Sequence, residues 1–146
     1  KIQQEADNYI WDSLDSVEQL GAVRMRAMSK FLSDFDTGCR QGRYLSASLP
    51  ALPFPDSEFD LALCSHYLFL YSEHVDGAAH LASMRELCRV ASEVRLFPVV
   101  SLYGKTSKHL DTVMRGRCAD CIDVSWQAVS YRLQKGATEM WGAKRG

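Results

Sequence analysis

The sequence contains no apolar run approaching the ~18 residues that a helix needs to cross a bilayer, so no membrane-spanning helix is expected. It also lacks an excess of charge of either sign, because 17 Lys and Arg oppose 18 Asp and Glu. The formal net charge of −1 provides no general attraction to nucleic acid or to an anionic membrane. No internal repeat and no low-complexity segment is visible, which excludes a solenoid.

The sequence has an odd number of cysteines, which are Cys39, Cys64, Cys88, Cys118 and Cys121. An odd number cannot all pair with one another in disulfides. Cys64 and Cys88 lie in apolar patterns and are expected to be buried free thiols. This usage fits a reducing compartment, and we expect a cytoplasmic protein. Cys118 and Cys121 form a lone C-x-x-C with no second ligand pair at a suitable spacing, so no metal site is expected.

The chain of 146 residues, 47% of them hydrophobic, is the right size for one domain with a real core. It starts with Lys1 rather than Met, and we expect it to be trimmed or to be the later part of a longer protein. Within it, residues 1–42 are predicted to be an amino-terminal helical segment. Residues 43–146 are predicted to form the α/β portion.

Apolar periodicity and turn residues predict a succession of helices and short strands. In chain order these are helices over 2–20 and 22–35, a strand over 43–47, an irregular segment over 48–58, a strand over 59–65, a helix over 76–91, a strand over 93–102, a helix over 108–116, and strands over 121–124 and 128–134. Alternation of strands and helices predicts an α/β sheet with parallel crossovers.

Individual residues sharpen these boundaries. Gly21 is expected to end the first helix, and Pro98 is expected to end or bulge its strand. The apolar run 59–65 suggests a strand buried on both faces. Only three residues separate the last two predicted strands, which favours an antiparallel hairpin.

The most informative stretch is 46–66, where a proline-rich loop runs into a short apolar strand that ends in Cys64, Ser65 and His66. Ligands bind beyond the carboxyl ends of the strands in open α/β sheets, so these residues are candidates for a binding site. An unperturbed imidazole titrates near neutrality, which makes His66 a candidate general base. It can equally cap the strand or bond to a neighbouring loop.

Several segments in order resemble class I S-adenosylmethionine-dependent methyltransferases. Leu52-Pro53-Phe54, a turn and Phe59-Asp60-Leu61-Ala62-Leu63 are similar to the stretch around that family's fourth strand. The helix sequence Arg85-Glu86-Leu87-Cys88-Arg89-Val90 is common after that strand. A further strand, a helix and a closing hairpin follow, as in the second half of the family's Rossmann-like fold, whose last strand runs antiparallel to the rest. The resemblance covers about residues 43–135.

The resemblance implies a methyltransferase with S-adenosylmethionine as cofactor. It places Ser48 and Leu49 beside the adenine, and Cys64 and Ser65 at the strand end that faces the cofactor sulfur and the substrate. His66 is the candidate catalytic residue. Tyr67 and Tyr71 are candidates for substrate binding, with core packing of the Tyr-Leu-Phe-Leu-Tyr run as the alternative.

The glycine-rich cofactor loop of that family is not found before residue 43, so the sheet is expected to be truncated at its amino-terminal side. The family's first strand lies mid-sheet, and its loss exposes an apolar edge. The alternative to an enzyme is therefore a non-catalytic α/β module that binds a protein partner or a second copy through that edge. A different Rossmann-like enzyme is a third hypothesis. The methyl acceptor is expected to be a small molecule or a protein rather than nucleic acid.

Overall fold

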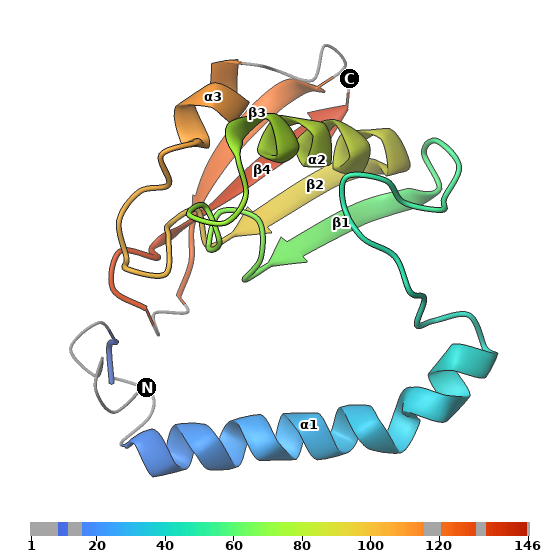
Figure 1. The fold of residues 1–146 in the computed structure, drawn as a ribbon, viewed down its shortest axis with the longest axis vertical. Helices are drawn as coiled ribbons and strands as arrows, with labels where there is room; N and C mark the ends of the chain where they lie inside the picture. The colour runs from blue at the N-terminus through green and yellow to red at the C-terminus, as the bar shows by residue number, and fades with distance from the viewer. Residues whose placement is uncertain (1–8, 12–15, 116–120, 131–133, 146) are drawn as a thin grey trace.

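The computed structural model describes residues 9–11, 16–115, 121–130 and 134–145, and the statements below concern these residues. Three helices and four strands follow one another (Figure 1): α1 (Val17–Arg40), β1 (Phe59–Ser65), α2 (Gly77–Val90), β2 (Ala91–Phe97), α3 (Leu110–Arg115), β3 (Cys121–Ala128) and β4 (Glu139–Arg145). None of the described helices combines the length and apolar character that crossing a membrane requires.

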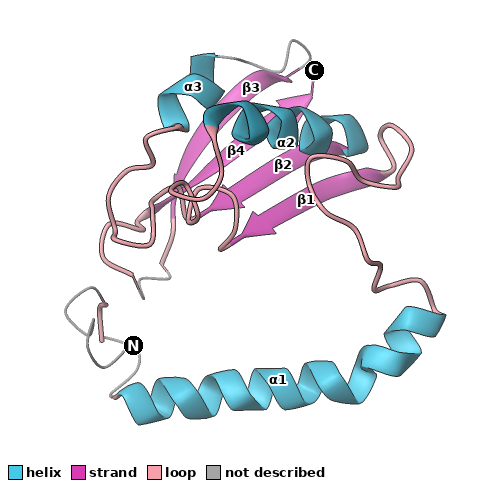
Figure 2. Cartoon of the chain, in the orientation of Figure 1, coloured by secondary structure: helices cyan, strands magenta, loops and turns pink. Residues whose placement is uncertain are grey.

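The four strands form one mixed sheet in the order β1-β2-β4-β3 (Figure 2). β1 and β2 are parallel and are connected through α2, as the α/β prediction requires. β4 lies between β2 and β3 and is antiparallel to both. β3 therefore runs in the same direction as β1 and β2, and the last strand of the chain is the only one of the four described strands that runs the opposite way.

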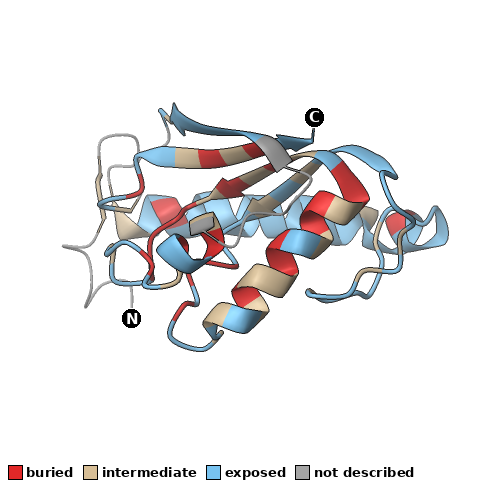
Figure 3. Cartoon of the chain, turned by 90° about the horizontal axis from the view of Figure 1, so that it is seen from above, coloured by how far each residue is buried: buried red, intermediate tan, exposed pale blue. Residues whose placement is uncertain are grey.

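The core lies between one face of this sheet and α2 with α3 (Figure 3). Alternate residues of β2, Val94 and Leu96, are buried, and their register partners on β4 are Ala143 and Trp141. α2 covers them with one apolar stripe at helical spacing, made of Met84, Leu87 and Cys88. Buried residues thus recur every second position along the strand and about every 3.6 positions along the helix, which is the pattern of a helix packed on a sheet.

Several predicted elements are confirmed. The strand over 59–65 is β1, and the helix over 76–91 is α2, whose N-cap Asp76 accepts a hydrogen bond from the Ala79 amide at 2.8 Å. β2 ends at Phe97, directly before Pro98, because proline has no amide hydrogen to donate to a sheet. Ser107 accepts a hydrogen bond from the His109 amide just before α3.

The predicted helix break at Gly21 is wrong, because α1 continues through this residue from Val17 to Arg40. A glycine inside a helix is unfavourable by about 1 kcal/mol, which the good helix formers on both sides offset. The first predicted helix, over 2–20, is also wrong at residues 9–11, which are not helical because Tyr9 pairs with Gln134 in an isolated antiparallel bridge. Its residues before Tyr9 and over 12–15 lie outside the described residues.

The strand predicted over 43–47 is also wrong: this segment turns back onto the end of α1 instead. Arg43 and Tyr44 both bond to Asp34, at 2.6 and 2.8 Å, and these bonds lower the pKa of Asp34 to about 2. The Tyr44 ring packs against Phe31 and Phe35 over Gly38, where a Cβ atom would collide with it. Side-chain contacts therefore decide the path of this segment.

The two closing strands pair differently from the prediction. Residues 121–128 form one strand, β3, and its antiparallel partner is β4 rather than residues 128–134. The intervening segment contains Gly136 at a φ of 83°, close to the backbone of Gly104. The Gln134 side chain donates to the carbonyl oxygen of Ser101 at 2.9 Å, and its backbone forms an isolated bridge with Tyr9 outside the named strands. Residues 131–133 of the predicted strand lie outside the described residues.

β1 is not buried on both faces, contrary to the prediction. It is an edge strand, and Leu61 and Leu63 on its outer face are 39% and 68% exposed. The helices described in contact with the sheet lie on its other face, so the face that carries these two leucines has no helical cover among the described residues.

His80 gives the fold a predictable pH dependence. It is fully buried on α2, its Nδ1 lies 2.7 Å from the Asp76 carbonyl oxygen, and the His109 ring lies 4.7 Å away. Burial above all, with His109 opposing a second charge, lowers the pKa of His80 below its usual range.

The unfolded chain therefore binds more protons than the folded chain once the pH falls below the usual histidine pKa of about 6.5. We expect the free energy of unfolding, measured by urea titration, to decrease as the pH is lowered below this value. His80→Gln should flatten this dependence, whereas His74→Gln, at an exposed position, should leave it unchanged. An unaltered pH profile in His80→Gln contradicts the prediction.

Candidate functional site

An open pocket of about 470 Å³ lies at the carboxyl end of β1. Three segments form its wall: the loop before β1, the end of β1 together with Tyr67 just after it, and α2. They contribute Ala47, Ser48, Leu49, Leu52, Leu63, Cys64, Ser65, Tyr67 and Leu87. The size is within the range of about 300–1,000 Å³ that is usual for small-ligand sites.

Five of the seven residues proposed from the sequence line this pocket together: Ser48, Leu49, Cys64, Ser65 and Tyr67. His66 and Tyr71 are not among the lining residues, although each lies beside one of them. Sequence reasoning missed the apolar members of the wall, above all Leu52, Leu63 and Leu87. Their signal was ordinary apolar periodicity, which does not distinguish a pocket wall from a core.

The geometry at the end of β1 explains how polar side chains reach the pocket. His66 has a φ of 53°, in the left-handed region, so the chain turns sharply after Ser65. The His66 amide donates to the Phe97 carbonyl oxygen at 2.7 Å, which anchors this turn to the end of β2. A non-glycine residue in this conformation is uncommon and is found disproportionately at functional sites.

The His66 side chain is held close to the pocket by its neighbours. Its Nδ1 lies 2.8 Å from the Ser65 Oγ in a hydrogen bond, and its ring packs edge-on against Phe97 at 5.6 Å between centroids. Partial burial and, to a smaller extent, the positive charge of Arg24 lower the pKa of His66 below its usual range. The imidazole is therefore neutral at neutral pH and able to accept a proton.

Cys64 is a different kind of group. It is half-buried in the pocket wall, and burial raises the pKa of its thiol. The thiol is therefore protonated at neutral pH and is not an activated nucleophile. Cys88 is buried, as predicted, whereas Cys64 is accessible from the pocket, which corrects the expectation that both are fully buried.

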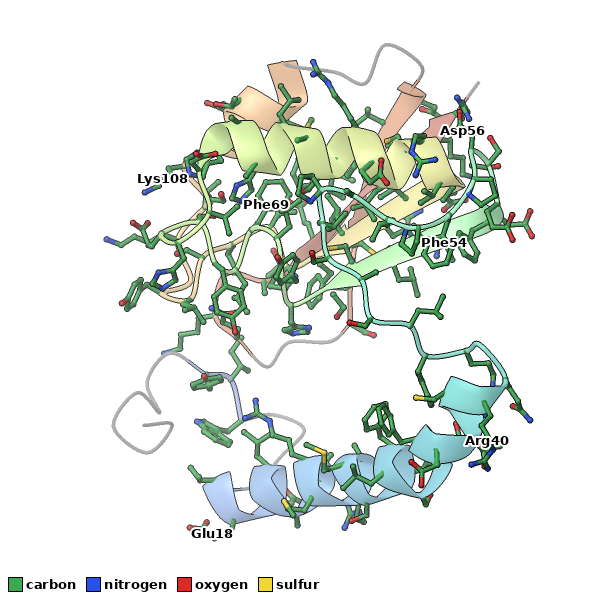
Figure 4. The ribbon with its side chains drawn as sticks, turned by 45° about the vertical axis from the view of Figure 1, so that its right-hand side comes forward. Glu18, Arg40, Phe54, Asp56, Phe69 and Lys108 are labelled. Atoms are coloured by element: carbon green, nitrogen blue, oxygen red, sulfur yellow. The ribbon has the colours of Figure 1, made fainter. Side chains whose placement is uncertain are left out.

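The aromatic run after β1 divides into two kinds of residue. Leu68, Phe69 and Leu70 are buried in the core, and Figure 4 shows Phe69 beneath α2. Tyr67 and Tyr71 are 45% and 40% exposed, with their ring centroids 6.4 Å apart. The core-packing alternative is therefore right for the three central residues and wrong for the two tyrosines.

The pocket has an uncharged wall, since none of its lining residues is acidic, basic or a histidine. Its polar groups are the hydroxyls of Ser48, Ser65 and Tyr67 and the thiol of Cys64. Such a wall provides no ion pair for a polyphosphate and suits a ligand with a flat apolar surface and a few hydrogen-bonding atoms. Among the described residues, no three His, Cys, Asp or Glu side chains group as metal ligands. Cys118 of the C-x-x-C lies outside those residues.

Comparisons with known proteins identify a relative of the chain. No family model matches the chain, and no solved structure matches it. The chain is 30% identical over 134 residues to an uncharacterized protein of Methanocaldococcus jannaschii. The alignment covers 92% of this chain and 58% of the relative, so the chain spans less than two thirds of the relative's length.

Proposed function

We propose that this chain is the carboxyl-terminal portion of a Rossmann-like, S-adenosylmethionine-dependent methyltransferase. The observation that carries the proposal is the convergence of Ser48, Leu49, Cys64, Ser65 and Tyr67 on one pocket beyond the carboxyl end of β1. The resemblance assigns Ser48, Leu49, Cys64 and Ser65 to the cofactor site from two separate segments of the sequence, and Tyr67 is a candidate for substrate binding from its aromatic run. A chance resemblance has no reason to bring both segments to the same pocket.

The sheet topology supports the same proposal. The resemblance requires parallel strands joined by a helix and a last strand that runs antiparallel to the others. β1, α2 and β2 have the first arrangement, and β4, between β2 and β3, has the second. Among the described strands none pairs with the outer edge of β1, and this edge is where the family's first strand would lie.

The pocket fits part of S-adenosylmethionine, which supplies an activated methyl group when it is bound. Ser48 and Leu49 would lie beside the adenine, one offering a hydroxyl and the other an apolar surface. Cys64 and Ser65 would lie toward the sulfur. Because the wall carries no charge, the positively charged sulfur of the cofactor would be stabilised by an aromatic face, and Tyr67, which lines the pocket, would supply it. The described residues provide no counterpart of the glycine-rich loop for the methionine part, and the relative's sequence beyond the alignment is the place to seek one.

In this proposal the chain's own residues act mainly by orienting the reactants and excluding water. The neutral imidazole of His66 would accept the proton that an oxygen or nitrogen acceptor loses. The Ser65 hydroxyl would hold the ring in place through the 2.8 Å bond. The exposed Tyr67 and Tyr71 would contact the acceptor.

We expect S-adenosylhomocysteine to bind this chain one-to-one in a calorimetric titration. Ser48→Ala should weaken binding by about fivefold, the typical contribution of one hydrogen bond. The matched control is Ser46→Ala, two residues earlier and outside the pocket. Bound S-adenosylhomocysteine should also slow alkylation of Cys64 and leave that of the exposed Cys39 unchanged. Absence of saturable binding by the folded chain contradicts cofactor binding by this portion alone.

His66→Ala in the complete protein should lower methyl transfer at least about tenfold, the low end of what a general base contributes. Release of S-adenosylhomocysteine in the presence of phenol, amine and thiol acceptors measures the turnover. Binding of S-adenosylhomocysteine should change by less than about twofold, because the imidazole does not line the pocket. Unchanged turnover removes His66 from the mechanism.

A specific observation also favours the second candidate, a binding module. Among the described residues, no strand pairs with β1 on the side away from β2, and Leu61 on that strand is exposed. α1 carries a further exposed apolar stripe at helical spacing, made of Met28, Phe31, Leu32 and Phe35, and no described strand or helix packs closely on it. Both surfaces suit association with another polypeptide.

The module hypothesis predicts concentration-dependent association of the chain in sedimentation velocity experiments. Leu61→Lys places a charge on the open face of β1 and should weaken association by about tenfold or more. Leu45→Lys, at an exposed position outside β1, should have little effect. A wild-type chain that stays monomeric at all accessible concentrations rules out self-association through this edge.

A further inference from the structure

The last turn of α2 holds the loop that forms one side of the pocket. The Glu86 Oε1 accepts a hydrogen bond from the Leu52 amide at 2.7 Å, and the Arg89 Nη2 donates to the Leu52 carbonyl oxygen at 3.3 Å. The Arg89 Nη1 also donates to the Phe54 carbonyl oxygen at 2.8 Å and to the Asp56 carboxylate at 2.7 Å. Phe54 and Asp56 lie on the loop beside this end of α2 (Figure 4).

These two side chains are themselves joined by a two-point ion pair. The Arg89 Nη2 lies 2.7 Å from the Glu86 Oε1, and the Arg89 Nε lies 2.8 Å from the Glu86 Oε2. The bonds from Arg89, followed by the bond from the Leu52 amide, lower the pKa of Glu86, so the carboxylate is ionised at neutral pH. Fork-to-fork contacts of this kind fix geometry as well as charge. We refer to the pair as the Glu86–Arg89 clamp.

Among the described residues, the loop forms little internal backbone hydrogen bonding of its own. Three of its residues, Pro50, Pro53 and Pro55, have no amide hydrogen to donate. Within 48–56, the internal backbone bond described is from the Ala51 amide to the Ser48 carbonyl oxygen, at 3.2 Å. The clamp bonds to both backbone groups of Leu52 and, through Arg89, to the Phe54 carbonyl oxygen.

The clamp also connects the two sides of the pocket. Leu52 lines the pocket from the loop, and Leu87 lines it from the same turn of α2 that carries Glu86 and Arg89. Ser48 and Leu49 precede Leu52 by only a few residues, and Leu49 and Leu52 pack against the core. The hydrogen bonds from the clamp to Leu52 therefore help to determine the distance between the loop side and the helix side of the pocket.

We infer that Glu86 and Arg89 are positioning residues, which hold the 48–56 loop at a fixed distance from α2 and thereby keep the pocket in its binding shape. Neither residue lines the pocket, so they act through Leu52 and not on the ligand. The identity of the ligand rests on the proposed function, but the effect on the loop does not.

The loop effect is tested by NMR measurement of amide hydrogen exchange in the unliganded chain. Glu86→Ala should accelerate exchange at the Leu52 amide by about tenfold or more, because this amide loses a charged acceptor. Glu86→Gln keeps an acceptor oxygen and should restore most of the protection. Arg85→Met, at an exposed position on the same helix, is the control for loss of an arginine on α2. Exchange at the Val94 amide in the central strand β2 reports general destabilisation.

Equal acceleration at Leu52 and Val94 in Glu86→Ala would mean that the clamp only stabilises the fold, and would overturn the inference. Unchanged exchange at Leu52 would overturn it as well. Selective acceleration at Leu52 supports it, whether or not the chain binds the proposed cofactor.

The effect on the pocket is tested by titration with S-adenosylhomocysteine. Glu86→Ala and Arg89→Met should each weaken its affinity by about tenfold or more, and Arg85→Met should change it by less than about twofold. If the wild-type chain does not bind, cofactor binding by this portion alone fails, while the exchange result still decides the loop effect. If the wild-type chain binds and Glu86→Ala binds equally well, control of the pocket by the clamp is refuted.

Discussion

The packing of α2 on one face of the sheet is the interaction on which the rest of the structure depends. Its apolar stripe, Met84, Leu87 and Cys88, buries Val94 and Leu96 of β2 and reaches Trp141 and Ala143 of β4. β1 and β2 can be parallel neighbours only if the chain returns along the sheet, and α2 is that return. Removing this contact would leave the strands without a covered face.

The same helix also makes the candidate site possible. One side of its last turns faces the core, and the side that faces the loop carries Glu86 and Arg89, which bond to the backbone of Leu52 and Phe54. Leu87, between them in sequence, is part of the pocket wall. A single helical turn thus contributes to the core, the pocket and the attachment of the loop, because residues three positions apart lie on neighbouring parts of a helix surface.

Among the described residues, the other face of the sheet carries ion pairs and lies in contact with no helix. Glu93 lies 2.6 Å from Arg95 and 3.3 Å from Lys144 on this face, while the apolar Leu61 and Leu63 of the neighbouring β1 remain exposed. Exposed ion pairs contribute little stability, so this face adds less to the fold than the face beneath α2. The incomplete cover of the sheet and the exposed stripe of α1 have the same consequence, which is apolar surface available to further polypeptide.

Local sequence determined the elements whose signals lie within a few residues. β1 and α2 were predicted with nearly correct bounds because apolar periodicity, the cap at Asp76 and the proline-rich loop act locally. The end of β2 before Pro98 follows from proline chemistry alone. The assignment of Ser48, Leu49, Cys64 and Ser65 to one site also came from sequence, through a resemblance that spans two segments.

Tertiary structure decided what depends on distant partners. Residues 43–47 turn back toward Asp34 instead of forming a strand, and β3 pairs with β4 across the segment in which Gln134 donates to the Ser101 carbonyl oxygen. A weak local preference of about 1 kcal/mol is overridden when long-range contacts of similar size favour another conformation. Three further features were not visible in the sequence, because each exists only where separate segments meet. They are the exposure of β1, the apolar wall of the pocket, and the hydrogen bonds from Glu86 and Arg89 to Leu52.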